Sequence, residues 1–353
     1  MTLKGLRSQI DKIDRKLTQL LNMRSKVSLA IGKLKTKSGK SIYSPEREIE
    51  VLRKAVRASK GPLKPSALEA IYREIMSSSL SLEKPLVIAY LGPQATFTNL
   101  AALKKFGSQV EYMACKSISE VFLEVEKGNA DYGVVPIENS IEGAVTHTLD
   151  MFVDSDLKIC SQIILDVAHN LLAKCSKGEI RRIYSNPQVF GQCRIWLQKN
   201  LCGVEEVEVS STTRAAQIAA TEKGSACIAS LLAARVYKLK VLARDIEDSP
   251  HNITRFLVIG NNDVPQTACA KTSIMFSIKD RVGALHDMLV PFKKYRVNLT
   301  KIESRPSKRK AWDYYFFLDL EGHRDSPKVK KAIQELESKC NFLKVLGSYP
   351  VRE

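Results

Sequence analysis

Two cations interrupt the apolar side of the first long periodic segment of the chain. Arg24 lies within a run of apolar residues spaced three and four positions apart, and Lys35 follows three helical turns later on nearly the same face. A charge in such a seam is costly unless it reaches solvent or meets a buried anion. Arg24 alone fits either interpretation, whereas two cations on one face indicate a cavity for an anionic ligand.

Polar clusters that follow short apolar runs form a second group of candidate residues. They occupy residues 92–98, residues 136–140 with Gly143, and residues 211–213. Each cluster alone could be a helix cap. Ligands of α/β sheets lie at the carboxyl ends of strands, near helix N-termini that favour anions. The recurrence of these clusters therefore indicates a substrate cleft.

The elements that must position the two cations are long helices in the first 85 residues. Residues 38–40 are predicted to end the first helix, Pro45 and the acidic residues after it are typical of a first turn, and a third helix is predicted from Pro65 to Glu83. The spacing of the apolar residues in the first helix predicts one buried seam, made of Leu3, Leu6, Ile10, Ile13, Leu17, Leu20, Val27, Ile31 and Leu34. This segment is predicted to be an all-α domain.

The elements that must position the polar clusters are short strands alternating with helices. Strands are predicted at residues 86–91, 132–137, 157–165, 181–185, 204–209, 225–229, 239–243 and 254–260. The long stretch between the first and the last of them favours an α/β domain with two lobes.

After a polar linker at residues 260–271, the pattern changes again. The predicted order is strand 272–280, helix 283–295, strand 299–305, strand 313–321, helix 326–339 and strand 342–349. This is the order of an α+β ferredoxin-like domain. We therefore expect a multidomain chain with domains at residues 1–85, 86–262 and 271–353.

Composition narrows the class of protein. The net charge of +17 resides in the ends of the chain, with +11 in residues 1–85, −2 in residues 86–270 and +8 in the remainder. On charge alone, a basic front end suits nucleic acid, a small polyanion or a solvated face. The cations in the apolar seam and the lack of a recognition motif favour the small polyanion over nucleic acid.

The eight cysteines and the hydropathy pattern set further limits. The cysteines form no CxxC motif or Cys/His cluster, so neither a metal site nor a disulfide framework is expected. No apolar run approaches the roughly 18 residues of a membrane span, and no signal-peptide pattern opens the sequence. We expect a cytoplasmic protein without a membrane partner.

The first segment resembles the all-helical chorismate mutase family. The resemblance is carried by Leu6-Arg7, Arg24, Gly32-Lys33-Leu34-Lys35 and Tyr43-Ser44-Pro45-Glu46-Arg47-Glu48. It implies that chorismate, a dianion, is bound by Arg7, Arg24, Lys35, Ser44, Arg47, Glu48, Ser79 and Glu83, with Lys35 and Glu83 in catalytic roles. The sequence departs from the family at Ser44, where an acidic residue is common. Glu83 stands where the family has Gln or Glu and can donate a hydrogen bond only when protonated, so mutase activity is expected to fall as pH rises.

Helix geometry adds a condition on that site. Arg7 and Lys35 are 28 residues apart on one helix, which separates them by about 42 Å. They cannot share a substrate within one chain. An antiparallel partner helix would bring the Arg7 of another subunit to Lys35, which predicts a homodimer, or a higher homo-oligomer, with composite sites.

The second segment resembles the prephenate dehydratase family. Its motifs are residues 92–98, 136–140 and 211–213 together with Asn252-Ile253-Thr254-Arg255-Phe256. The resemblance implies that prephenate is bound by Thr96, Phe97, Glu138, Asn139, Ser140, Ser211, Thr212, Thr213, Thr254, Arg255 and Phe256. Prephenate loses carbon dioxide and a hydroxyl together, and Thr254 is the candidate donor to the leaving hydroxyl. His169 and His251 are assigned minor roles, because an isolated histidine is usually structural.

The third segment is similar to the ACT domains attached to dehydratases. The signature residues are Gly283, Ala284 and Leu285, followed by Glu303, Ser304, Arg305 and Pro306. The resemblance implies that L-phenylalanine binds there and inhibits a bifunctional enzyme of phenylalanine biosynthesis, which needs no cofactor. The alternative is a regulatory protein that binds an aromatic acid without catalysis.

Overall fold

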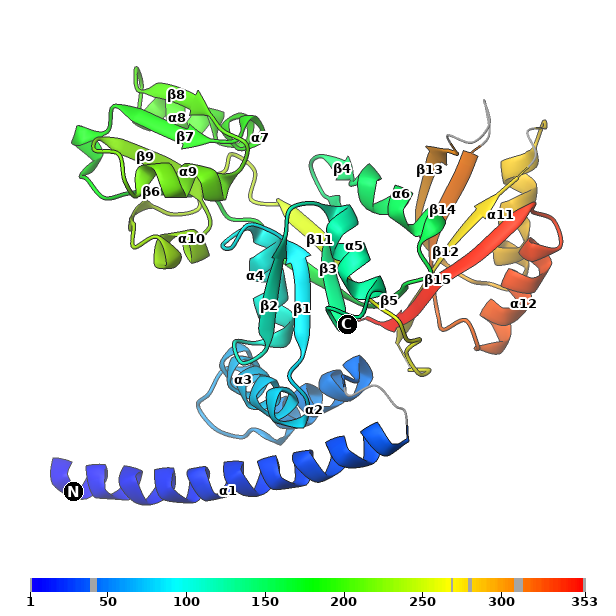
Figure 1. Ribbon diagram of the computed structural model, residues 1–353, viewed down its shortest axis with the longest axis horizontal. Coiled ribbons are helices and arrows are strands. Elements are labelled where there is room, and N and C mark those ends of the chain that lie inside the picture. Colours follow the sequence, from blue (N-terminus) through cyan, green and yellow to red (C-terminus); the bar gives the residue numbers. More distant parts are fainter. Residues whose placement is uncertain (1, 39–42, 268, 279–280, 308–313, 352–353) are drawn as a thin grey trace. The chain divides into compact units, whose positions relative to one another are not determined.

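The computed structural model describes residues 2–38, 43–267, 269–278, 281–307 and 314–351 (Figure 1). The chain forms two compact units. The first comprises residues 1–87 and 105–111, and the second comprises residues 88–104 and 112–353. In the described part of the chain, no helix has both the length and the apolarity needed to cross a bilayer.

The first unit is built from three helices, as predicted. They are α1 (Leu3–Lys37), α2 (Pro45–Ala58) and α3 (Pro65–Glu83). The Thr2 side chain caps α1 by accepting a hydrogen bond from Gly5 N, and α2 and α3 both begin with proline. Gly32 is the buried residue of α1, and a Cβ there would lie 2.9 Å from Glu83 Cβ. The glycine therefore lets α1 and α3 approach closely.

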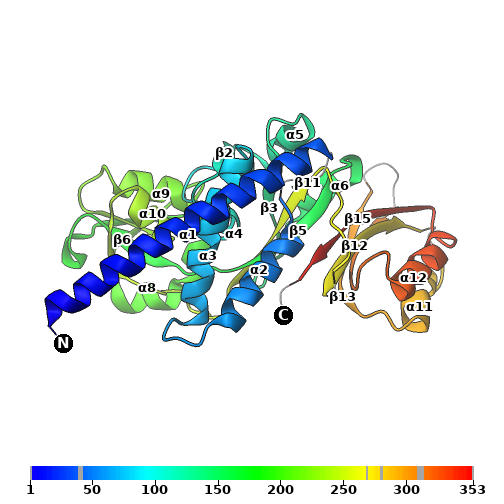
Figure 2. The same ribbon diagram turned by 90° about the horizontal axis from the view of Figure 1, so that it is seen from below.

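The apolar seam of α1 differs from its prediction. The seam residues from Leu3 to Leu34 are 41–68% exposed in the chain. The side of α1 that packs on α3 carries Arg24, Ser28 and Gly32 instead. Figures 1 and 2 show α1 extending well beyond α3. The seam is exposed because no other part of the described chain covers it.

The second unit contains two sheets that correspond to the predicted lobes. The first sheet has the order β2-β1-β3-β11-β5, with β4 paired to β3, and the second has the order β10-β6-β9-β7-β8. The chain leaves the first sheet after β5 and returns to it at β11 (Figure 1). The strands of the first sheet are β1 (Val87–Leu91), β2 (Glu111–Cys115), β3 (Tyr132–Asn139), β4 (Gly143–Ala144), β5 (Lys158–Asp166) and β11 (Ile253–Gly260). Those of the second are β6 (Asn170–Ala173), β7 (Arg182–Ser185), β8 (Glu205–Glu208), β9 (Ser225–Ala229) and β10 (Lys240–Ala243).

Helices connect these strands. With the first sheet lie α4 (Phe97–Phe106), α5 (Ile118–Glu126) and α6 (Thr146–Asp154). With the second lie the short helix η1 (Lys177–Glu179), α7 (Pro187–Gln192), α8 (Arg194–Asn200), α9 (Thr212–Ala219) and α10 (Leu231–Val236). Strands β2, β4 and β6 were not predicted from the sequence.

A third sheet follows the predicted ferredoxin-like order. It has the strand order β13-β14-β12-β15, and α11 and α12 bury its apolar core. Its elements are β12 (Ala270–Ser277), α11 (Ala284–Lys294), β13 (Leu299–Pro306), β14 (Tyr314–Glu321), α12 (Pro327–Glu337) and β15 (Phe342–Pro350). The predicted ends at residues 279, 280 and 313 lie outside the described residues.

Candidate functional site

The first unit contains a cavity of about 290 Å³ between its three helices and residues 105–106. Five cationic side chains and two carboxylates line it, which gives the wall a positive balance. The cations are Arg24, Lys35, Arg47, Arg73 and Lys105, and the carboxylates are Glu48 and Glu83. Such a wall suits a small anion.

Hydrogen bonds fix several of the predicted residues around this cavity. Arg24 Nη1 donates to Ser79 Oγ at 2.5 Å, so Arg24 is held in the cavity wall and does not extend into solvent. Lys35 Nζ donates to Ser44 Oγ at 3.1 Å. Arg47, whose side chain is 60% exposed, lines the cavity and pairs with Glu50 at 2.5 Å.

Glu83 lies at the end of α3 and accepts a hydrogen bond from Ser28 Oγ at 2.9 Å. It therefore faces α1 within the cavity that Lys35 also lines. Arg7 is the one predicted residue that this cavity lacks. It is exposed in the second turn of α1, which is continuous from Leu3 to Lys37. The structure thus brings seven of the eight predicted residues together, Ser44 and Ser79 among them, and leaves Arg7 apart.

Sequence reasoning did not assign five polar residues to this cavity, which are Ser28, Tyr43, Arg73, Ser77 and Lys105. Arg73 could have been found, because residues 73, 76, 80 and 83 follow the three-and-four spacing of one helix face. Lys105 carries no such signal, because it follows the first strand of the next sequence segment.

The second candidate site lies where β3 and β11 pair. Thr254 is directly opposite Asn139 in the antiparallel register, and Asn139 Nδ2 donates to Thr254 Oγ1 at 2.8 Å. The same amide donates to Asn252 Oδ1 at 2.8 Å. Because Asn139 occupies an acceptor position of the Thr254 hydroxyl, the hydroxyl proton is free to point to a substrate.

A chain of amides extends from this pair to a buried histidine. Asn252 Nδ2 donates to Gln192 Oε1 at 3.0 Å, and the same oxygen lies 2.7 Å from His169 Nε2. His169 is 1% exposed, and burial lowers its pKa because the charged ring would lose its hydration. The ring of Phe97 packs edge-on against His169, with centroids 5.7 Å apart. The structure thus connects Phe97 to Thr254 through His169, Gln192, Asn252 and Asn139. Of these four residues, sequence reasoning had assigned only Asn139 to prephenate binding, had given His169 a minor role and had not singled out Gln192.

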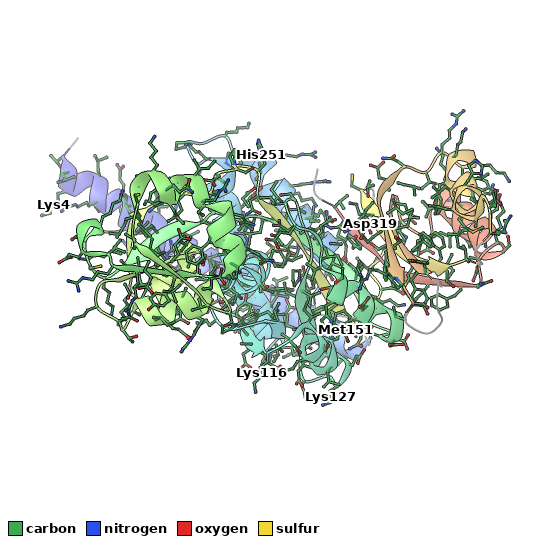
Figure 3. All side chains as sticks on the ribbon, turned by 90° about the horizontal axis from the view of Figure 1, so that it is seen from above. Lys4, Lys116, Lys127, Met151, His251 and Asp319 are labelled. Atoms are coloured by element: carbon green, nitrogen blue, oxygen red, sulfur yellow. The ribbon has the colours of Figure 1, made fainter. Side chains whose placement is uncertain are left out.

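Arg255 and Glu138 take a different direction from their neighbours Thr254 and Asn139. Arg255 Nε lies 2.7 Å from Glu138 Oε1, and Arg255 Nη1 lies 2.6 Å from Asp319 Oδ2 on β14. Figure 3 labels Asp319 on the third sheet. Successive side chains alternate across a strand, which explains the separation. The structure therefore does not bring Arg255 and Glu138 to Thr254, and their binding of prephenate stays a prediction.

The remaining predicted dehydratase residues stabilise local structure. Ser140 Oγ donates to His251 O at 2.7 Å, and Phe256 is buried. Thr96 Oγ1 donates to Leu91 O at 3.1 Å. Ser211 caps α9, while Thr212 and Thr213 are buried in its first turn. The contact of Ser211 is local, because its Oγ accepts a hydrogen bond from Arg214 N in the same helix.

The third candidate site is a cavity of about 380 Å³ at the start of α11, lined by Gly283, Ala284 and Leu285. Gly283 has φ +76°, and a Cβ there would meet nothing within 4 Å. Glycine is therefore required for backbone conformation and not for close approach. The other half of the predicted signature, residues 303–306 on the edge strand β13, does not line this cavity. In residues 303–306, the Arg305 side chain instead donates hydrogen bonds from Nε and Nη2 to the carboxylate of Asp150, each at 3.2 Å.

Three family models match the chain in succession. Chorismate mutase type II matches residues 6–84, prephenate dehydratase residues 88–264, and the ACT domain residues 272–338. A bifunctional chorismate mutase/prephenate dehydratase of Aquifex aeolicus is 51% identical over 99% of this chain and 98% of that protein. The protein of the same description from Pseudomonas aeruginosa is 46% identical over 99% and 97%.

A solved structure supports the assignment of the second and third segments. The prephenate dehydratase of Arthrobacter aurescens, in complex with L-Phe, has a TM-score of 0.70 and 32% identity, covering 75% of this chain and 90% of that one. The chain therefore belongs to the bifunctional chorismate mutase/prephenate dehydratase family, with both enzyme activities and an ACT domain.

Proposed function

We propose that the cavity of the first unit rearranges chorismate to prephenate. Its positive wall is the observation that carries this assignment, because chorismate is a dianion. The rearrangement is pericyclic and needs no nucleophile, only a compact substrate conformation and positive charge or hydrogen-bond donors where the ether oxygen becomes electron-rich. Lys35 is the proposed cation at that oxygen, with Glu83, when protonated, as the proposed donor beside it.

We further propose that a second copy of the chain supplies Arg7 in a homodimer. The exposed apolar seam of α1 and the separation of about 42 Å between Arg7 and Lys35 support this. In an antiparallel pair of α1 helices, each seam covers the other, and each Arg7 reaches the cavity of its partner. The antiparallel pair of α1 helices therefore accounts both for the exposed seam and for the separation of Arg7 from Lys35.

Complementation between two inactive variants tests the composite site. Arg7→Ala and Lys35→Ala should each have very low mutase activity. When the two are coexpressed, random pairing places one unaltered site in each mixed dimer, which restores about a quarter of wild-type activity. The matched control is Lys4→Ala. Lys4 is an exposed cation three residues before Arg7 in α1, and its substitution should leave mutase activity unchanged. A dimeric mixture as inactive as its parents would contradict the proposal.

We propose that Thr254 donates a hydrogen bond to the hydroxyl that leaves prephenate. Its bond from Asn139 supports the role, because an accepted bond orients the Thr254 oxygen and leaves its proton available. The amides of Asn252 and Gln192 extend the orientation to His169. A threonine hydroxyl is a weak acid, so its contribution is a positioned donor, with aromatisation of the ring as the driving force.

Substitution of Thr254 separates catalysis from mere binding of an aromatic acid. Thr254→Val should lower dehydratase kcat by about 10²- to 10³-fold, in the range of losing one oriented donor. Thr254→Ser should retain most activity. Thr221→Val, on an exposed turn, is the matched control. If Thr254→Val binds prephenate and turns it over at the wild-type rate, Thr254 is not the donor.

We propose that L-phenylalanine binds the ACT domain and lowers dehydratase activity. The cavity at Gly283, Ala284 and Leu285 supports a ligand site, and the Arthrobacter aurescens dehydratase is described in complex with L-Phe. Phenylalanine can shift the equilibrium between two states only by its difference in affinity for them. If it lowers the affinity for prephenate, prephenate must lower the affinity for phenylalanine by the same factor. Tight binding of phenylalanine without any change in dehydratase activity would rule out the feedback.

We also propose a cytoplasmic location and domain limits at residues 1–85, 86–262 and 271–353. The family matches end within a few residues of these limits, except that the ACT match stops at residue 338. Limited proteolysis followed by mass spectrometry tests the limits, because cleavage concentrates in exposed linkers. Early cleavage near residues 84–86 and 262–271 is expected. Cell fractionation tests the location.

A further inference from the structure

Lys105 belongs to the mutase cavity although the dehydratase family model covers its position. It lies near the end of α4, within residues 88–264, yet it lines the cavity of the first unit. Lys105 Nζ lies 2.9 Å from Glu48 Oε2, and the two side chains are each 13% exposed. The pair is therefore largely shielded from water, unlike the Arg47–Glu50 pair, whose side chains are 60% and 47% exposed.

The surroundings fix the orientation of the Glu48 carboxylate. Tyr43 OH donates to the same oxygen, Oε2, at 3.0 Å. The Tyr43 ring also lies under Lys105, with Nζ 5.9 Å from its centroid, and packs against Phe106 at 5.0 Å. Tyr43 and Lys105 thus both contact Oε2 of a residue that lines the cavity, which leaves Oε1 as the oxygen available to a ligand.

The charge of Glu48 is unfavourable for a dianionic substrate unless a cation offsets it. A carboxylate in a cavity that binds two other carboxylates repels them, and desolvation increases the repulsion. A carboxylate can bind such a substrate only through a hydrogen-bond donor. The ionised form of chorismate has one, its ring hydroxyl. Lys105 offsets the negative charge of Glu48. It also holds one oxygen of that carboxylate, so the other oxygen can accept the hydroxyl of the substrate.

We propose that Lys105 is a positioning residue of the mutase site, which holds the Glu48 carboxylate so that Oε1 accepts the ring hydroxyl of chorismate. The inference rests on the proposed function of the cavity. It means that the mutase site needs a residue from beyond the segment that resembles mutases. Lys105 acts through Glu48 and does not itself contact the substrate.

Steady-state kinetics of the full-length enzyme test this role. Lys105→Met should lower mutase kcat/KM by about 10- to 100-fold, mainly through a higher KM, because the hydroxyl contact is present in both the ground and the transition state. Lys105→Arg should restore most of the loss. Lys104→Met, an exposed neighbour in the same helix, is the matched control and should leave the mutase unchanged. Dehydratase activity, assayed with added prephenate, should be unchanged in Lys105→Met.

A double-mutant cycle separates the possible roles of Lys105. In a Glu48→Gln background, Lys105→Met should have little further effect, because Glu48 mediates the role. Equal losses in both backgrounds would overturn the proposal in favour of direct contact between Lys105 and substrate. A parallel loss of dehydratase activity and thermal stability would overturn it in favour of a purely structural role, as would kinetics within twofold of wild type. Wild-type enzyme without mutase activity would instead reject the proposed function itself.

Discussion

The substitution Arg255→Met removes the cation from a buried charge cluster while keeping much of the side-chain volume. Arg255 contacts Glu138 at 2.7 Å and Asp319 at 2.6 Å, and the side chains of Arg255 and Asp319 are each 8% exposed. Glu138 keeps an ion pair with Lys301. Asp319 keeps a hydrogen bond from Ser273 Oγ at 2.5 Å, but among the described residues no other cation forms an ion pair with it. We therefore expect the variant to unfold more easily.

The expected loss of stability follows from this geometry. Removing one partner of a buried ion pair costs about 3–5 kcal/mol, and the remaining bond from Ser273 favours the lower value, about 3 kcal/mol. For a unit of this size, each kcal/mol shifts Tm by about 2–4 °C, so a fall of about 6–12 °C is expected. The double substitution Arg255→Met with Asp319→Leu should recover most of the loss, because it leaves no unpaired carboxylate at that position.

Scanning calorimetry and the KM for prephenate together distinguish the two interpretations of Arg255. In the matched control, Arg324→Met breaks an exposed pair with Asp263, whose side chains are 33% and 42% exposed, and should cost no more than about 1 kcal/mol. The reasoning is refuted if Arg255→Met keeps the wild-type Tm while its KM for prephenate rises about tenfold or more. Arg255 would then bind the substrate, as the sequence resemblance implies.

Three further predictions concern titration and backbone conformation. Because burial lowers the pKa of His169, the unfolded state binds more protons below the ordinary value of 6.5, so Tm should fall on acidification below that pH and fall less in His169→Gln. Glu83→Gln should be at least as active a mutase as the wild type, because an amide always carries a hydrogen-bond donor; a variant at least tenfold less active would contradict the donor role at residue 83. Gly283→Ala should destabilise the ACT domain by about 1 kcal/mol, since φ is +76°, and should raise the phenylalanine concentration for half inhibition. Gly178→Ala, at a glycine without positive φ, is its control, and equal inhibition of wild type and Gly283→Ala would contradict the site.

The helices were predictable because their ends carry strong local signals. Pro45 and Pro65 begin α2 and α3 at the predicted residues, and α3 ends at Glu83 as predicted. Strands β2 and β6 lacked comparable signals. Strand β2, residues 111–115, lies at the edge of its sheet, and its sequence does not alternate between polar and apolar residues. Strand β6 is only four residues long. Strand formation at such an edge strand, and at such a short strand between β10 and β9, depends on the neighbours in the sheet more than on the strand's own residues.

The separation of Arg255 from Thr254 was partly predictable. Adjacent residues of a strand face opposite sides, so a motif of consecutive residues cannot all contact one ligand through side chains. What occupies the far side was not predictable, because Asp319 lies 64 residues away in the next domain. The pairing of β11 with β3 also shifts register between Arg255 and Phe256, which local sequence does not indicate.

The length of α1 is the feature that sequence and structure explain only together. At about 1.5 Å per residue, its 35 residues span about 52 Å, whereas the 19 residues of α3 span about 28 Å. Roughly 24 Å of α1 therefore has no helix of its own unit beside it, and its seam of apolar residues is exposed there. Monomeric proteins rarely expose such a continuous apolar surface. The same stretch carries Arg7, so the antiparallel pairing that we propose would both cover the seam and bring Arg7 to the cavity of the partner. If that proposal holds, replacing apolar residues of the seam with polar ones should abolish mutase activity before it affects the dehydratase.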